Sequence, residues 1–167
     1  MSKFNDSAFQ STVESIRKAP ASGIAPFHVA FDLVDGVEGT AKVRDFAPIV
    51  LDEPENFGGS NLGPNPVEYL LTGAVGCFSI GLALSLAHAG ITVKKLHTDL
   101  DSSVDFNTML GLVEGGRHGV NDITLALTID ADAEDETIWK HIRHSLATSP
   151  VLNSLNIKIR VLPPTFH

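Results

Sequence analysis

The sequence predicts an α+β fold, in which locally joined β-strands pair with one another and two separate helices pack against them. This prediction rests on segments with alternating apolar and polar residues, on segments with apolar residues at helical spacing, and on the turn-rich stretches between them. The chain shows no internal repeat. Its 167 residues suffice for one domain with a sizeable core, since single domains usually hold roughly 100–200 residues.

The N-terminal residues are expected to form a short amphipathic helix followed by a linker. Within residues 4–18, Phe9, Val13 and Ile16 recur at helical spacing. The next residues, 19–26 (APASGIAP), are rich in Ala, Gly and Pro and are typical of a turn or linker.

Two strands and a long loop are expected next. Apolar side chains alternate with polar ones in residues 28–34 (HVAFDLV), and residues 37–46 (VEGTAKVRDF) are their expected partner strand. Residues 52–66 (DEPENFGGSNLGPNP) contain too many Gly, Pro and Asn residues for a regular element and predict a long loop.

A long apolar helix follows, with clear start and stop signals. Asn65 is suited to the N-cap, Pro66 to the first helical position, and Glu68 to the third position of a capping box. Gly90 is the expected C-terminal end. The run between Glu68 and His88 carries no charge, but it is rich in small and polar residues and has no basic residue at its start, so we predict a buried helix rather than a membrane span.

The C-terminal half alternates strands with one more helix. In the second helix Ile138, Ile142 and Leu146 form the expected core stripe, and its charges match the helix dipole. The expected elements are a strand over residues 96–106, a hairpin loop over 111–122, a strand over 123–129, a helix over 133–147, a capped turn over 149–155 and a strand over 157–161.

Composition and charge exclude several classes of partner. Hydrophobic residues make up 43% and charged residues 19% of the chain, which is typical of a folded domain. The net charge is −8 and no basic cluster occurs, so nucleic acid and anionic membrane surfaces are poor partners. One cysteine cannot form an internal disulfide, and the N-terminal sequence lacks a secretion signal; both favour the cytosol.

The single cysteine, Cys77, lies in the middle of the long helix and allows two interpretations. A lone cysteine is most often a small buried hydrophobe, and a free thiol with a pKa of about 8.5 is only a few per cent thiolate at neutral pH. Gly73 and Gly81 lie one turn to either side on the same helix face, which lets another backbone come close. That neighbour is expected to be either the helix over 133–147 or the same helix of a second subunit.

The stretch DEPENFGGSNLGPNPVEYLLTGAVGCFSIGLALSLAHAGI (52–91) resembles the OsmC/Ohr family of osmotically induced and organic-hydroperoxide-resistance proteins. These proteins share an Asn-Pro helix start and a cysteine at the spacing of Asn65 and Cys77. The resemblance continues through GLVEGGRHGVNDITLALTID and SPVLNSL. It implies an N-terminal extension over residues 1–26 and an OsmC-like domain over residues 27–167.

The resemblance also implies an intertwined homodimer, in which antiparallel sheets wrap around two long central helices. In the thiol peroxidases of the family, a first cysteine attacks an organic hydroperoxide as thiolate and becomes a sulfenic acid. An arginine from an early strand stabilises this thiolate, and a glutamate early in the helix positions the arginine. A second cysteine, before a Pro-Val pair, resolves the intermediate.

Carried over to this chain, the resemblance assigns Cys77 as the peroxidatic cysteine. Ser149 stands where the resolving cysteine would be. The family glutamate follows the Asn-Pro pair directly, where this chain has Val67; Glu68 is one position later, rotated by about 100° around the helix. Arg44 is the candidate for the thiolate-stabilising arginine.

Each candidate also has an ordinary structural explanation. Glu68 fits the third position of a capping box, and Ser149 fits the N-cap of the following turn. Arg44 fits an exposed position on a strand. His141 and His144 share a helix face but have no evident third ligand, so neither a metal site nor a cofactor is expected.

The leading hypothesis is a cytosolic, cofactor-free thiol peroxidase that reduces organic hydroperoxides in oxidative-stress defence, with Cys77 as nucleophile, Arg44 as its electrostatic partner and Glu68 as a further candidate. An external thiol would have to reduce the sulfenic acid. The alternative is a non-enzymatic dimer that binds a small apolar or electrophilic ligand and keeps Cys77 for packing. Hydrolase chemistry through Cys77 and a histidine is a third, weaker idea, because no matching His-Asp pair is recognisable.

Overall fold

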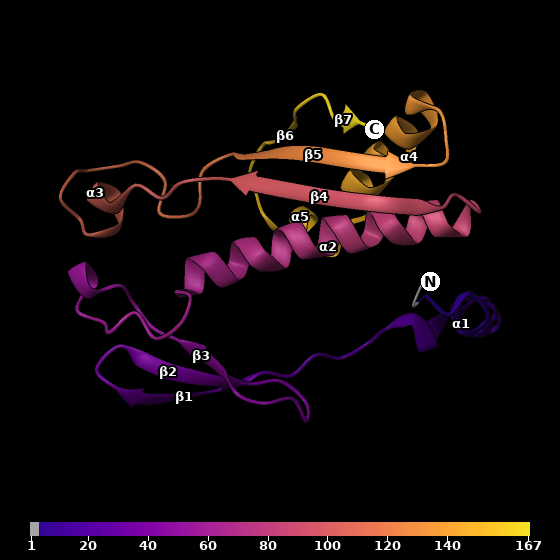
Figure 1. Cartoon of the computed structure of the whole chain (residues 1–167). Helices are drawn as coiled ribbons and strands as arrows, with labels where there is room; N and C mark the ends of the chain where they lie inside the picture. Colours follow the sequence, from indigo (N-terminus) through magenta and orange to yellow (C-terminus); the bar gives the residue numbers. More distant parts are fainter. Residues whose placement is uncertain (1–3) are drawn as a thin grey trace. The chain divides into compact units, whose positions relative to one another are not determined.

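A computed structural model of the chain describes residues 4–167 and confirms the mixture of helices and strands expected of an α+β fold (Figure 1). The chain forms two compact units, of which the first ends at Glu68 and the second spans Tyr69–His167. The first unit holds α1 (Asp6–Lys18), η1 (Pro20–Gly23), β1 (Ala30–Asp35), β2 (Glu38–Lys42), β3 (Ile49–Leu51), η2 (Glu55–Phe57) and the first residues of the long helix α2 (Pro66–His88).

The N-terminal helix forms as expected, with a polar cap at its start. The side-chain oxygen of Asn5 accepts a hydrogen bond from the Ala8 backbone N–H at 3.1 Å. Arg17 and Lys18 lie in the last turn, where positive charge suits the helix dipole. None of the helix residues is fully buried, so α1 presents its apolar stripe on the surface of its unit.

The three strands of the first unit form an antiparallel sheet in the order β1-β2-β3. The expected pairing of residues 28–34 with residues 37–46 is present, but β2 ends at Lys42 rather than continuing through Arg44. Arg44 instead adopts a positive φ of 49°, a conformation that breaks the strand and turns the chain towards β3, which the sequence analysis did not anticipate.

The second unit combines a four-stranded sheet with helices. Its elements after α2 are β4 (Val93–Asp101), α3 (Phe106–Met109), β5 (Ile123–Ala131), α4 (Asp135–Thr148), α5 (Pro150–Ser154), β6 (Ile159–Val161) and β7 (Thr165–Phe166). Strands β4 and β5 pair antiparallel, but β6 and β7 both run parallel to β5. The sheet is therefore mixed, because the crossover through α4 and α5 brings the chain back in the direction of β5.

The strand expected over residues 96–106 is shorter than its alternating pattern suggested. The carboxylate of Asp105 accepts hydrogen bonds from the Asn107 backbone N–H and the Thr108 hydroxyl, both at 2.9 Å. These bonds cap a short helical turn, α3, so the chain leaves the sheet at Asp101.

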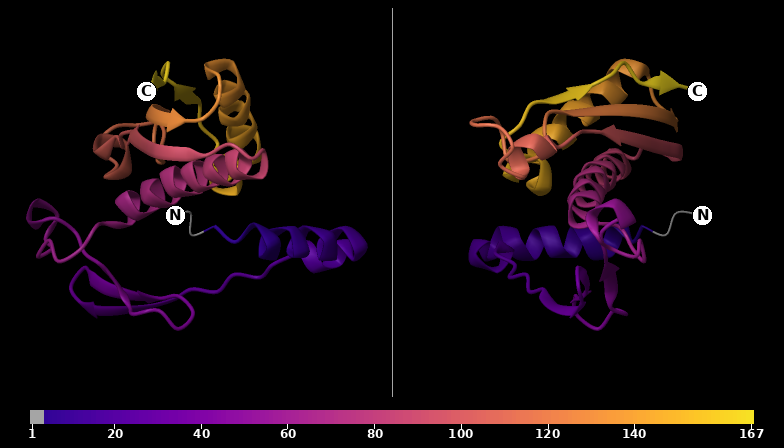
Figure 2. Two further views of the ribbon diagram at one scale, coloured as in Figure 1. Left: turned by 45° about the vertical axis from the view of Figure 1, so that its right-hand side comes forward. Right: turned by 90° about the vertical axis from the view of Figure 1, so that its left-hand side faces the viewer.

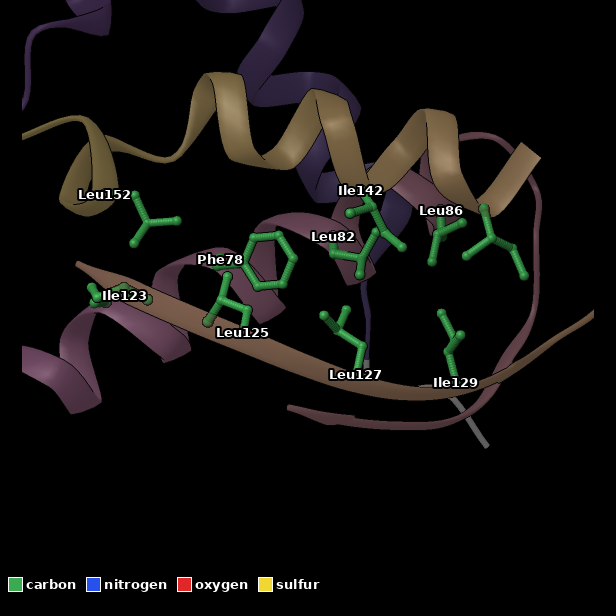
Figure 3. Packing of buried hydrophobic residues seen from close by; sticks show 11 residues of the cluster. Phe78, Leu82, Leu86, Ile123, Leu125, Leu127, Ile129, Ile142 and Leu152 are labelled. Atoms are coloured by element: carbon green, nitrogen blue, oxygen red, sulfur yellow. The ribbon is translucent and has the colours of Figure 1, made fainter. Parts of the chain in front are cut away.

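The core of the second unit lies between α2, α4, α5 and one face of β5 (Figures 2 and 3). The inward face of β5 alternates as predicted, and each fully buried aliphatic or aromatic side chain contributes roughly 1.5–3 kcal/mol of transfer free energy. The predicted stripe on α4 is confirmed at Ile138 and Ile142, but the third buried position is Ser145, and Leu146 is only half-buried. The buried apolar residues are Ala74, Phe78, Leu82, Leu86, Ile123, Leu125, Leu127, Ile129, Ile138, Ile142 and Leu152.

Helix α2 is long and apolar enough to cross a membrane by length and composition. In this fold, however, one side of the helix packs into the core through Phe78 and Leu82, and the Ser79 hydroxyl donates to Thr98 Oγ1 of β4 at 3.0 Å. Only this side of α2 is buried in the structure, so the helix is less buried than the sequence analysis predicted.

Candidate functional site

The start of α2 is fixed by a complete capping box. The Asn65 backbone N–H donates to Glu68 Oε2 at 2.8 Å, and the Glu68 backbone N–H donates to Asn65 Oδ1 at 2.9 Å. Pro66 occupies the first helical position, which needs no N–H donor. The capping role predicted for Asn65 and Glu68 is confirmed, and it occupies one oxygen of the exposed Glu68 carboxylate.

Cys77 lies near the middle of α2 and is half-buried. The next residue, Phe78, is fully buried in the core and fixes the rotation of the helix about its axis. The sulfur is therefore held at the boundary between the core and the helix surface. The residue as a whole is therefore less buried than a core cysteine.

The Cys77 sulfur has a hydroxyl partner from a distant part of the chain. The Ser149 hydroxyl donates to Cys77 Sγ at 3.2 Å, and Ser149 is 4% exposed. Ser149 also caps α5, as predicted, because its Oγ accepts from the Leu152 backbone N–H at 3.4 Å. The contact with sulfur was not anticipated, although the resemblance already placed Ser149 at the position of a cysteine that must reach Cys77.

A second polar contact joins α2 to α4 two turns further along. Ser85 Oγ lies 2.7 Å from His141 Nδ1. Burial lowers the pKa of His141, and the positive charges of Lys140 and His144 lower it further, so the neutral imidazole is favoured. Ser85 lies two turns after Cys77 on α2, whereas its partner His141 lies two turns before Ser149, the partner of Cys77. Helix α4 therefore runs antiparallel to α2.

The two glycines beside Cys77 face open space within this unit. Among residues 4–167, and apart from the neighbouring residues and backbone of α2 itself, no heavy atom lies within 4 Å of the position that a Cβ would take at Gly73 or Gly81. Of the two neighbours predicted for the glycine row, the helix over 133–147 contacts α2 at Ser85 through His141 but leaves the space at the glycines open. The second predicted neighbour, the same helix of a second subunit, stays a prediction.

The candidate for the thiolate-stabilising arginine, Arg44, lies in the first unit. Arg44 is exposed, and its guanidinium carbon stands 4.5 Å from the centroid of the Phe46 ring, a cation–π contact within the turn after β2. Arg44 and Glu68 belong to the first unit and Cys77 to the second. A contact between Arg44 and Cys77 stays a prediction.

The loop before α2 is organised by a carboxylate that the sequence analysis did not single out. Asp52 is 2% exposed, and its carboxylate accepts three backbone N–H bonds, from Glu53 at 2.8 Å, Ser60 at 2.9 Å and Leu62 at 3.1 Å. These bonds, led by the one from Leu62, hold the pKa of Asp52 below its usual value although burial acts in the opposite direction. An aspartate that follows a strand just before a Gly-rich loop is the signal that could have identified it.

Within residues 4–167, no group of three His, Cys, Asp or Glu side chains lies close enough to hold a metal ion. His141, one of the two histidines considered for such a site, is engaged with Ser85 instead.

Comparison with known families places these features in context. The sequence model of the family described as OsmC-like protein matches residues 58–162, which include α2, Cys77 and Ser149. The chain belongs to the OsmC-like protein family. The resemblance stated from the sequence is thereby confirmed, and with it the general OsmC-like fold. A search of curated protein sequences found no match.

Solved structures of OsmC-like proteins share this fold. An OsmC-like protein from Mycoplasma pneumoniae superposes with a TM-score of 0.72 at 24% identity, covering 85% of this chain and 97% of that one. An organic hydroperoxide resistance protein from Elizabethkingia anophelis has a TM-score of 0.65 at 18% identity, with 86% and 99% covered. An organic hydroperoxide resistance protein OsmC from Legionella pneumophila has a TM-score of 0.60 at 14% identity, with 86% and 100% covered.

Proposed function

We propose that this OsmC-like protein is a cytosolic thiol peroxidase that reduces organic hydroperoxides through Cys77. The observation that carries the proposal is a half-buried cysteine with a hydroxyl donor 3.2 Å from its sulfur. A hydrogen-bond donor favours the anionic sulfur over the neutral thiol, and the thiolate is the nucleophile. Fold neighbours described as organic hydroperoxide resistance proteins supply the substrate class for this proposal.

The proposed reaction has two stages. The Cys77 thiolate attacks the terminal oxygen of the hydroperoxide, an S–O bond forms, the O–O bond breaks, and the leaving alkoxide takes up a proton to give the alcohol. The sulfur is then a sulfenic acid. An external thiol attacks this sulfur, water leaves, and a second external thiol releases the cysteine and yields the oxidised disulfide of the reductant.

An external reductant follows from the cysteine count, because the chain has one cysteine and no second thiol to resolve the intermediate. Arg44 is proposed as the cation that stabilises the thiolate, as the resemblance implies. A catalytic role for Glu68 also stays a prediction, although its capping bond to Asn65 explains the residue without chemistry.

The proposal includes a homodimer in which α2 of one subunit meets α2 of the other. Two features support this arrangement: the open space at Gly73 and Gly81, and the exposure of Leu70 and Ile80 on the same long helix, at 40% and 64%. Large apolar side chains beside a row of glycines are suited to close helix packing. Sedimentation of the purified protein tests this part, and a monomer at micromolar concentration would contradict it.

The activity is tested by stopped-flow consumption of cumene hydroperoxide with a dithiol reductant, comparing the wild type with Cys77→Ser. Serine preserves the size of the side chain and removes the nucleophile, so circular dichroism should match while turnover disappears. Equal rates for the two proteins would remove the enzyme assignment.

The absence of a second cysteine supports a different function as well, a non-enzymatic dimer that binds a small apolar or electrophilic ligand. Iodoacetamide alkylation across a pH series separates the two. A rate whose midpoint lies at or above the value of a free thiol, about pH 8.5, would favour the ligand-binding protein.

A further inference from the structure

We infer that Ser149 is a catalytic residue of this protein, a hydrogen-bond donor to the Cys77 sulfur that stabilises the reacting sulfur and stays on it through its oxidation. This inference rests on the proposed function and deepens it. A hydroxyl at this position stabilises the reacting sulfur instead of attacking it, so the oxidised cysteine waits for a thiol from outside the chain.

The bonding pattern of the Ser149 hydroxyl leaves its proton for the sulfur. A hydroxyl has one proton to donate and can accept two bonds. Ser149 Oγ accepts the Leu152 backbone N–H at 3.4 Å, which uses an oxygen lone pair and leaves the proton available. The hydroxyl donates that proton to Cys77 Sγ at 3.2 Å, within the distance expected of a bond to sulfur.

The position of this hydroxyl is fixed from several sides. Ser149 is 4% exposed, so water competes little for its proton. The Asn153 side-chain N–H donates to the Ser149 backbone carbonyl oxygen at 2.8 Å and to the Leu146 carbonyl oxygen at 3.1 Å, which ties the end of α4 to the start of α5. Two turns back along α4, the contact between His141 and Ser85 holds the same helix against α2.

This arrangement sets what each group does in the first stage. Cys77 supplies the electron pair for the S–O bond, the leaving alkoxide takes its proton from solvent, and Ser149 keeps its own proton throughout. The donor therefore stabilises the negative charge of the attacking sulfur before oxygen transfer, and it remains a hydrogen-bond donor to the sulfenic acid afterwards. Because the Ser149 side chain has no sulfur atom, it cannot form a disulfide with the oxidised Cys77.

The test compares Ser149→Ala with Ser145→Ala. Ser145 lies one turn earlier on α4, is 2% exposed, and its hydroxyl has no hydrogen-bond partner among residues 4–167, so its removal is a matched control for a buried serine. For Ser149→Ala we expect the pH midpoint of iodoacetamide alkylation to rise by about one unit, since a hydrogen bond to a charged group is worth about that much, and the peroxide step at pH 7 to slow roughly tenfold. For Ser145→Ala both quantities should stay at wild-type values.

A third variant, Ser149→Cys, tests whether position 149 lies next to Cys77, and its readout is a new product instead of a loss of activity. Its new thiol should form a disulfide with Cys77 after one equivalent of cumene hydroperoxide, seen as the loss of two hydrogens by mass spectrometry. A wild-type alkylation midpoint in Ser149→Ala, together with no disulfide in Ser149→Cys, would overturn the role of Ser149 while leaving a wild-type peroxidase intact. If the wild type shows no turnover, the peroxidase is lost, and the alkylation midpoints still decide whether Ser149 acts on the sulfur.

Discussion

The capping box at the start of α2 offers a direct way to separate structure from chemistry at Glu68. In Glu68→Ala the Asn65 backbone N–H loses its partner at 2.8 Å, at a cost of about 1 kcal/mol, and the negative charge at the helix N-terminus is lost, at a further cost of about 0.3–1 kcal/mol. In Glu68→Gln the amide oxygen still accepts the N–H, so only the smaller charge term is lost. At fixed protein concentration, we expect the urea midpoint to be highest for the wild type, lower for Glu68→Gln and lowest for Glu68→Ala.

Turnover of cumene hydroperoxide in the same two variants decides the catalytic role. If Glu68 serves only as a cap, both variants keep wild-type turnover wherever they are folded, and Ala differs from Gln in stability alone. A stable Glu68→Gln protein with turnover reduced roughly tenfold or more would refute the reasoning, because it would show that the charge itself assists the reaction.

Three further predictions concern stability. Replacing Ile142, which is fully buried against α2 and β5, with Ala should lower the free energy of unfolding by roughly 2–5 kcal/mol, whereas Leu112→Ala at a 69% exposed position should stay within about 0.5 kcal/mol of wild type in urea titrations. The lowered pKa of Asp52 means that its stabilisation is present above the ordinary carboxyl value of about 3.9 and is lost as the pH falls through the lower folded value; Asp52→Asn should remove this acid dependence and speed amide hydrogen exchange in the loop after β3 at neutral pH. The pKa of His141 is lowered because burial disfavours its charged form in the folded state. As the pH falls below about 6.5, the unfolded chain therefore takes up a proton before the folded one, and the free energy of unfolding should decrease. His141→Gln should flatten that decrease.

The elements with strong local signals were predictable. Asn65, Pro66 and Glu68 marked the start of α2, and the alternation from Ile123 to Ile129 marked β5, because each pattern depends on neighbours within a few residues. The end of β4 was not predictable in the same way. An alternating pattern continued to Phe106, but the hydrogen bonds of Asp105 favoured a helical turn over the strand.

The site was predictable only in part. The resemblance singled out Cys77 and the serine at position 149, and local chemistry explained that serine as a cap. Their contact joins residues far apart in sequence, and no local pattern encodes it. The same holds for the His141 contact with Ser85, and for the parallel direction of β6, which depends on the path of the chain through α4 and α5.

The parallel pairing of the last two strands has a consequence for how the second unit is made. On the side of β5 away from β4, its backbone groups are satisfied by residues from the end of the chain: the Leu162 N–H donates to Leu125 O at 2.9 Å, and the His167 N–H donates to Ile129 O at 3.1 Å. During synthesis, this edge of the most buried strand stays bare until residues 159–167 leave the ribosome. A chain without these residues would keep a long apolar edge open, and such edges recruit strands from other molecules, so aggregates are the expected product of deleting residues 159–167.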